Sequence, residues 1–97
     1  NNTDKISEYL QKGAIILDVR TPMEFKEGHV KGSINIPLQQ ITSRVDEIKK
    51  YNKPVVACCR SGARSGNATT FLIGKGIDTI NGGPWQTVDS CLQASKS

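Results

Sequence analysis

The sequence predicts an open parallel α/β sheet with helices on both faces. Short apolar runs alternate with helical patterns along the chain, and the connections between them are too long for hairpins. Residues 14–17 (AIIL) are apolar at every position, as in a parallel strand that is covered on both faces. The 97 residues are enough for one domain with one core. Ligands of such folds bind beyond the carboxyl ends of the strands, so a site is expected in the loops that follow them.

The predicted elements follow the spacing of apolar side chains and the positions of glycine and proline. In order, they are a helix over 4–11, a strand over 14–17, a helix from 22 to about 28, a strand over 33–36, a helix over 39–50, a strand over 55–58, a helix over 65–75, a strand over 77–80 and a helix from 84. Thr21, followed by a proline, is a typical helix start, and Glu24 lies where it could complete a capping box. Residues 81–83 (NGG) are predicted to form a turn.

One stretch, residues 55–65 (VVACCRSGARS), combines an apolar strand, a polar loop that contains glycine, and the start of a helix. This arrangement gathers backbone N–H groups around one point, and the helix dipole adds positive potential there. Cys59 stands at the mouth of the loop, where such a field favours the thiolate, the reactive form of cysteine. We therefore predict that Cys59 is an activated nucleophile and that the loop holds an anionic group on it.

The charges around this loop are all positive, because residues 55–76 contain only Arg60, Arg64 and Lys75 as charged residues. The two arginines are predicted to attract an anionic substrate, and a bracing role in the loop is the alternative for Arg64. Cys58 ends the apolar strand and is predicted to point into the core. Packing roles are predicted for Cys91 and Trp85.

Composition argues against several other classes of function. The net charge of +4 comes from scattered cations with no aromatic residues among them, which is not typical of a nucleic-acid surface. No apolar run approaches the length of a membrane span. Three cysteines, two of them adjacent, do not indicate a disulfide framework, and one histidine without a C-x-x-C pair does not indicate a zinc site. The cysteines favour the cytoplasm; a periplasmic location stays open because a signal peptide could have been removed.

Two motifs make the chain resemble a single-domain rhodanese. Residues 16–25 (ILDVRTPMEF) and 28–37 (GHVKGSINIP) resemble the first motif of that family, and residues 59–65 (CRSGARS) resemble its active-site loop. Residues 65–68 (SGNA) add a resemblance to the small phage-shock-protein-E-like members. The resemblance implies a rhodanese-like open parallel sheet of four to five short strands, with helices on both faces, in a single domain over residues 1–97.

By resemblance the chain is a thiosulfate sulfurtransferase in which Cys59 accepts a sulfur atom as a persulfide. The loop residues that would bind the substrate are Arg60, Ser61, Gly62, Ala63, Arg64 and Ser65. The resemblance implies a small anionic sulfur donor, an acceptor that is cyanide or a thiol (a protein thiol included), and a monomer with no cofactor, metal, nucleic acid or membrane. Asp18, Arg20 and Glu24 are then a capping and ion-pair network, and His29 belongs to the scaffold and is not a general base.

Two other functions remain as alternatives. Cysteine phosphatases and arsenate reductases use a cysteine, five intervening residues and an arginine, and the stretch from Cys58 to Arg64 fits that spacing. From Cys59 only four residues intervene, and a smaller loop suits a single sulfur atom better than a tetrahedral oxyanion. The second alternative is a non-catalytic rhodanese-like interaction module, and the presence of Cys59 argues against it.

Overall fold

The computed structural model describes residues 2–95 and contains a four-stranded parallel sheet. The strands are β1 (Ile15–Asp18), β2 (Ile34–Asn35), β3 (Val55–Cys59) and β4 (Thr79–Pro84). Their order in the sheet is β2-β1-β3-β4, so the strand before the candidate loop lies between two neighbours. This confirms the predicted parallel sheet. Residues 1, 96 and 97 of the predicted domain lie outside the described residues.

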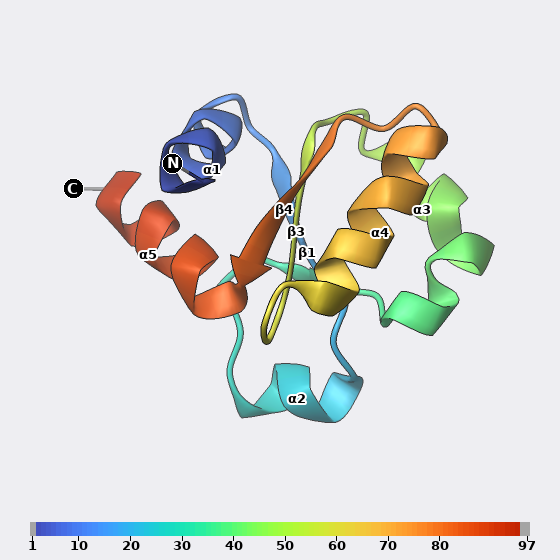
Figure 1. The fold of residues 1–97 in the computed structure, drawn as a ribbon, viewed down its shortest axis with the longest axis horizontal. Helices are drawn as coiled ribbons and strands as arrows, with labels where there is room; N and C mark the ends of the chain where they lie inside the picture. Colours follow the sequence, from blue (N-terminus) through green and yellow to red (C-terminus); the bar gives the residue numbers. More distant parts are fainter. Residues whose placement is uncertain (1, 96–97) are drawn as a thin grey trace.

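Helices cover both faces of the sheet, as predicted. Figure 1 shows α1 (Asn2–Gln11) and α5 (Trp85–Ser95) on one side, and α3 (Val45–Lys50) and α4 (Ala63–Gly74) on the other. The short helix α2 (Pro22–Glu27) lies beyond the carboxyl ends of the strands. Among residues 2–95, no helix combines the length and apolar character needed to cross a membrane.

The core consists of two apolar clusters, one on each side of the sheet. The first faces α3 and α4 and contains Leu17, Val19, Ile36, Ile41, Ile48, Val55, Cys59, Ala68, Leu72 and Ile77. The second faces α1 and α5 and contains Ile6, Tyr9, Ile16, Val30, Val56, Cys58, Val88 and Cys91. Side chains alternate between the faces along β3, and this alternation places the two adjacent cysteines in different clusters.

The prediction of a single helix over residues 39–50 is wrong for the first half of that range. Two 3-10 turns, η1 (Leu38–Gln40) and η2 (Thr42–Arg44), precede α3. The Ser43 hydroxyl donates to the Gln40 carbonyl at 3.1 Å, and the Arg44 N–H donates to the Ile41 carbonyl at 3.2 Å. In an α-helix the Arg44 N–H would pair with the Gln40 carbonyl. The serine side chain therefore competes with the helical hydrogen bond at this point.

The turn predicted over residues 81–83 is also wrong, because β4 continues through them to Pro84. A Cβ atom on Gly82 would lie 2.6 Å from Val88 Cγ2 and 2.8 Å from Val56 Cγ1. Glycine is required here for close packing inside a strand, not for a change of direction. Other differences concern boundaries: α4 begins at Ala63 and not at residue 65, and β4 begins at Thr79 and not at residue 77.

Candidate active site

The candidate nucleophile, Cys59, is the last residue of β3. The chain then turns through residues 60–62 into α4, and Gly62 has a φ angle of 100°, a conformation that glycine adopts without strain. The turn folds back over the sulfur, and Cys59 has an exposed fraction of 0%. The side chain therefore lies beneath the loop, enclosed by the backbone that follows it.

The sulfur of Cys59 is surrounded by hydrogen-bond donors. The Gly62 N–H donates to Sγ at 3.0 Å, and Ser65 Oγ lies 3.3 Å from Sγ. Burial raises the pKa of the Cys59 thiol, but hydrogen bonds from the Ser65 hydroxyl and from the N–H groups of Ser65, Gly62 and Ser61 outweigh burial, and the pKa lies below its ordinary value. The loop thus favours the thiolate, which is the form that reacts.

The environment of Cys58, unlike that of Cys59, disfavours the thiolate. Its side chain lies in the second apolar cluster, on the far side of the sheet from Cys59, and its exposed fraction is 0%. Burial, followed by the negative charge of Asp18, raises the pKa of the Cys58 thiol. A phosphatase-type loop from Cys58 to Arg64 would need this sulfur at the centre of the loop, and the structure instead places it in the core.

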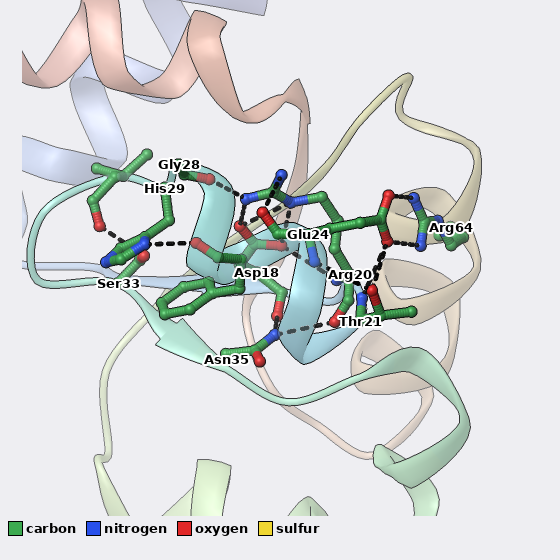
Figure 2. Close-up of polar contacts among 11 residues, drawn as sticks. Asp18, Arg20, Thr21, Glu24, Gly28, His29, Ser33, Asn35 and Arg64 are labelled. Atoms are coloured by element: carbon green, nitrogen blue, oxygen red, sulfur yellow. Dashed lines mark hydrogen bonds and ion pairs between the residues drawn. The ribbon is translucent and has the colours of Figure 1, made fainter.

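Arg64 braces the loop through an ion pair. Its guanidinium donates from Nη1 to Glu24 Oε1 at 2.7 Å and from Nη2 to Glu24 Oε2 at 2.9 Å (Figure 2). The pair joins α2 to the first turn of α4, so the Arg64 side chain is already neutralised. Arg60, by contrast, is exposed, and no ion pair of its side chain occurs among the interactions described for residues 2–95.

The first motif is a buried ion-pair network, as predicted. Arg20 donates to both carboxylate oxygens of Asp18, at 2.7 to 3.1 Å, and the two residues have exposed fractions of 4% and 0% (Figure 2). Arg20 also donates to the carbonyls of Glu24 and Gly28. The Asn35 amide donates to the carbonyls of Asp18 and Arg20. The network therefore fixes α2 and β2 relative to the end of β1.

Local contacts hold both ends of α2, and the capping box at its start was predicted from the sequence. The Glu24 N–H donates to Thr21 Oγ1 at 3.2 Å, and the Thr21 N–H donates to Glu24 Oε1 at 3.0 Å, which completes the capping box. His29 Nδ1 lies 2.7 Å from the Phe25 carbonyl oxygen, and the two rings stack with centroids 3.7 Å apart. These contacts give His29 a scaffold role at the end of the helix.

Two residues near the loop have roles that the sequence did not indicate. The side chain of Asn81, in the middle of β4, bonds to Ser65, Gly62 and Gly83. Trp85 packs against the second apolar cluster, as predicted, but it is only half-buried, and its ring centroid lies 5.2 Å from Arg20 Cζ. A pocket of about 240 Å³ beside the loop is lined by Arg20, Glu24, Glu27, Gly28, Arg60 and Trp85. The place of Trp85 directly after the carboxyl end of β4 was the available signal for its role near the site.

A comparison with protein families assigns the fold and the loop after Cys59 to one family. Residues 2–83 match the family described as "Rhodanese-like domain". The chain belongs to this family. The match covers the network around α2, the loop after Cys59 and most of β4, so the two motifs lie within one rhodanese domain.

Individual rhodanese relatives agree with this assignment. The chain is 32% identical over 73 residues to "Thiosulfate sulfurtransferase GlpE" of Haemophilus influenzae, a match that covers 75% of this chain and 69% of that protein. It is 37% identical over 57 residues to "Thiosulfate sulfurtransferase PspE" of Escherichia coli, with 58% and 55% covered. The reduced CoADR-RHD of Bacillus anthracis superposes with a TM-score of 0.76 at 32% identity, covering 96% of this chain and 17% of that chain. The matches thus span between about half and about two thirds of the curated relatives' lengths.

Proposed function

We propose that this rhodanese domain is a sulfurtransferase that moves a sulfane sulfur through a persulfide on Cys59. The observation that carries the proposal is a buried cysteine whose sulfur lies against the Ser65 hydroxyl and the loop N–H groups, which together lower the pKa of its thiol. The names of the two sulfurtransferase relatives support the same reaction. The proposed donor is thiosulfate or a similar small anion, and the proposed acceptor is cyanide or a thiol, including a protein thiol.

The transfer divides into two displacements at sulfur. In the first, the Cys59 thiolate attacks the outer sulfur of thiosulfate, the new S–S bond forms, and sulfite leaves with the electron pair of the broken bond. In the second, cyanide attacks the terminal sulfur of the persulfide. Thiocyanate leaves and Cys59 returns as a thiolate. A thiol acceptor would take the same sulfur as its own persulfide.

The loop would stabilise the negative charge that moves outward from Sγ to the terminal sulfur. Backbone N–H groups that converge on one point bind an anion without needing to reorganise. Arg60 would add a free positive charge at the rim, whereas Arg64 would contribute only its backbone N–H because its guanidinium pairs with Glu24. The residues proposed to bind the substrate are Arg60, Ser61, Gly62, Ala63, Arg64 and Ser65.

We further propose that residues 1–97 act as one rhodanese domain, as a monomer, in the cytoplasm. The family match over residues 2–83 supports the single domain, and the three free cysteines support the cytoplasm. Light scattering of the purified chain measures the oligomeric state directly, and a dimer mass would contradict the monomer. Export of the full-length protein to the periplasm, tested by cell fractionation, would contradict the cytoplasmic location.

The test is the initial rate of thiocyanate formation from thiosulfate and cyanide. Cys59→Ser should abolish turnover, whereas Cys58→Ala should keep most of it, because Cys58 lies on the far side of the sheet. Hydrolysis of an aryl phosphate by the same samples should be undetectable. Equal rates for wild type and Cys59→Ser would overturn the proposal, and phosphate release that needs Cys58 would favour the phosphatase alternative.

A further inference from the structure

The side chain of Asn81 makes three hydrogen bonds around the candidate active site. Its Nδ2 donates to the Gly62 carbonyl at 3.0 Å. Its Oδ1 accepts from the Gly83 N–H at 2.9 Å and from the Ser65 hydroxyl at 2.6 Å. The amide therefore joins β4 to the loop that encloses Cys59.

Two backbone groups fix the orientation of this amide independently of Ser65. The Gly83 N–H can only donate and the Gly62 carbonyl can only accept, so Oδ1 must face Gly83 and Nδ2 must face Gly62. Exchanging the two atoms would place donor against donor and acceptor against acceptor. Ser65 consequently faces an oxygen that cannot donate.

The Ser65 hydroxyl has one proton and two neighbours that can accept it. Asn81 Oδ1 lies 2.6 Å from Oγ, and Cys59 Sγ lies 3.3 Å from Oγ on another side. Because Oδ1 can only accept, the short contact requires that the proton point to Asn81 in the described state. A lone pair of Oγ is then directed at sulfur, where a thiol proton on Cys59 can bond to it.

We propose that Asn81 is a positioning residue that competes with Cys59 for the proton of the Ser65 hydroxyl. While Sγ carries no charge, as a thiol or as the inner sulfur of a persulfide, the hydroxyl donates to Asn81. When Sγ is a thiolate, the hydroxyl rotates and donates to sulfur, and the contact with Asn81 lengthens. The serine proton thus follows the charge on Sγ, and Asn81 holds it in the uncharged states.

Within the proposed sulfur transfer, this exchange would assist the second step. When an acceptor attacks the terminal sulfur, Sγ leaves as a thiolate, and the Ser65 hydroxyl can turn to it at once. This consequence rests on the proposed function, whereas the competition for the proton rests only on the contacts of Asn81, Ser65 and Cys59. A measurement on the resting thiol therefore tests the competition even if sulfur transfer is not the reaction.

The experiment measures the pKa of Cys59 from the pH dependence of its alkylation rate, with the modified residue identified by mass spectrometry. The Cys59→Ser variant gives the background rate at which Cys58 and Cys91 are alkylated. Other groups that act on Cys59 include Arg64 of α4 and Cys58 of β3, and every variant below keeps both. The variants are Asn81→Ala, Ser65→Ala and the double substitution; Asn67→Ala, an exposed position on α4, is the matched control.

Ser65→Ala should raise the Cys59 pKa by about one pH unit, since it removes one hydrogen bond to a charged group. Asn81→Ala should lower that pKa by about half a unit, because the freed hydroxyl donates to sulfur. The loop should stay in place, because the Gly62 carbonyl also accepts from the Gly66 N–H at 2.9 Å. The double substitution should match Ser65→Ala alone, and Asn67→Ala should match wild type.

Two results would overturn the proposal. They are an unchanged or raised pKa in Asn81→Ala, and an Asn81→Ala effect of equal size with and without the Ser65 hydroxyl, which would show that Asn81 acts through the loop backbone. Asn81→Asp covers the case in which Asn81→Ala does not fold. It keeps an oxygen facing Ser65 and adds negative charge, so the Cys59 pKa should rise; a fall would contradict the proposed competition.

Discussion

The guanidinium of Arg64 and the carboxylate of Glu24 form two parallel hydrogen bonds, at 2.7 and 2.9 Å, between residues that are 40 positions apart in the chain. The pair joins the first motif to the helix that follows the candidate nucleophile. Glu24 also accepts from the N–H and hydroxyl of Thr21. The hydrogen bond from Arg64, followed by that from the Thr21 backbone, lowers the pKa of Glu24 to about 2.

Glu24→Gln should destabilise the domain at neutral pH, because it removes the charge that pairs with Arg64 and leaves an amide N–H₂ facing a guanidinium. The folded pKa of about 2 lies below the ordinary value of 4.5, so the carboxylate contributes stability above pH 4.5 and loses it as the pH falls through about 2. Thermal unfolding of both proteins from pH 7 to pH 2 checks this. The difference in Tm should be constant near neutral pH and should shrink below pH 4.5; a difference independent of pH would contradict the ion pair.

Arg60→Ala should raise the KM for thiosulfate about two- to fivefold, since a free cation at the rim attracts a dianion with an energy of about 1 kcal/mol. It should also weaken the dependence of kcat/KM on ionic strength. Lys53→Ala is the matched control, because Lys53 is exposed and lines a pocket with Pro54, the residue before β3, at the opposite end of that strand from Cys59. Steady-state kinetics at several salt concentrations give both quantities. Equal salt dependence in Arg60→Ala and wild type would show that Arg60 does not steer the donor.

Cys58 should resist modification in the folded protein, because its sulfur lies in the second apolar cluster and its thiol pKa is raised, whereas the pKa of Cys59 is lowered. At pH 8, iodoacetamide should label Cys59 well before Cys58, and both should react at similar rates in about 8 M urea. Tandem mass spectrometry of the peptide that contains both residues distinguishes them. Faster labelling of Cys58 than of Cys59 in the native protein would contradict the assignment of the nucleophile.

Gly82→Ala should lower the free energy of unfolding by about 1–3 kcal/mol, as overpacking does in a closed core. The added Cβ would approach side-chain carbons of Val88 and Val56 to 2.6 and 2.8 Å. Gly74→Ala is the control, because nothing lies within 4 Å of its added Cβ. Urea denaturation of the three proteins measures the effect. A loss in Gly74→Ala as large as that in Gly82→Ala would show that the contacts of Gly82 are not the cause.

The features that the sequence predicted correctly depend on neighbouring residues. The capping box of Thr21 and Glu24 spans one helical turn, and the ion pair of Asp18 and Arg20 joins residues two positions apart. The position of Cys59 follows from its place at the end of an apolar strand. In each case, the residues that decide the structure lie close together in the chain, where local rules apply.

The features that were missed depend on contacts between distant segments. Gly82 looks like a turn residue in the sequence, but Val56 on a neighbouring strand requires the absence of a side chain. Asn81 was placed in the same predicted turn, and only the pairing of β3 with β4 brings it next to Ser65. The helix predicted through Ser43 failed for a different reason. There the serine side chain competes with a local helical hydrogen bond, and helix propensity alone does not predict this competition.

In the proposed reaction, Cys59 carries the transferred sulfur atom. The most direct measurement is the intact mass of the protein after incubation with thiosulfate and again after addition of cyanide, for wild type, Cys58→Ala and Cys59→Ser. Wild type and Cys58→Ala should each gain one sulfur atom that cyanide removes, and Cys59→Ser should gain none. A gain of sulfur in Cys59→Ser, or no gain in Cys58→Ala, would contradict sulfur transfer through Cys59.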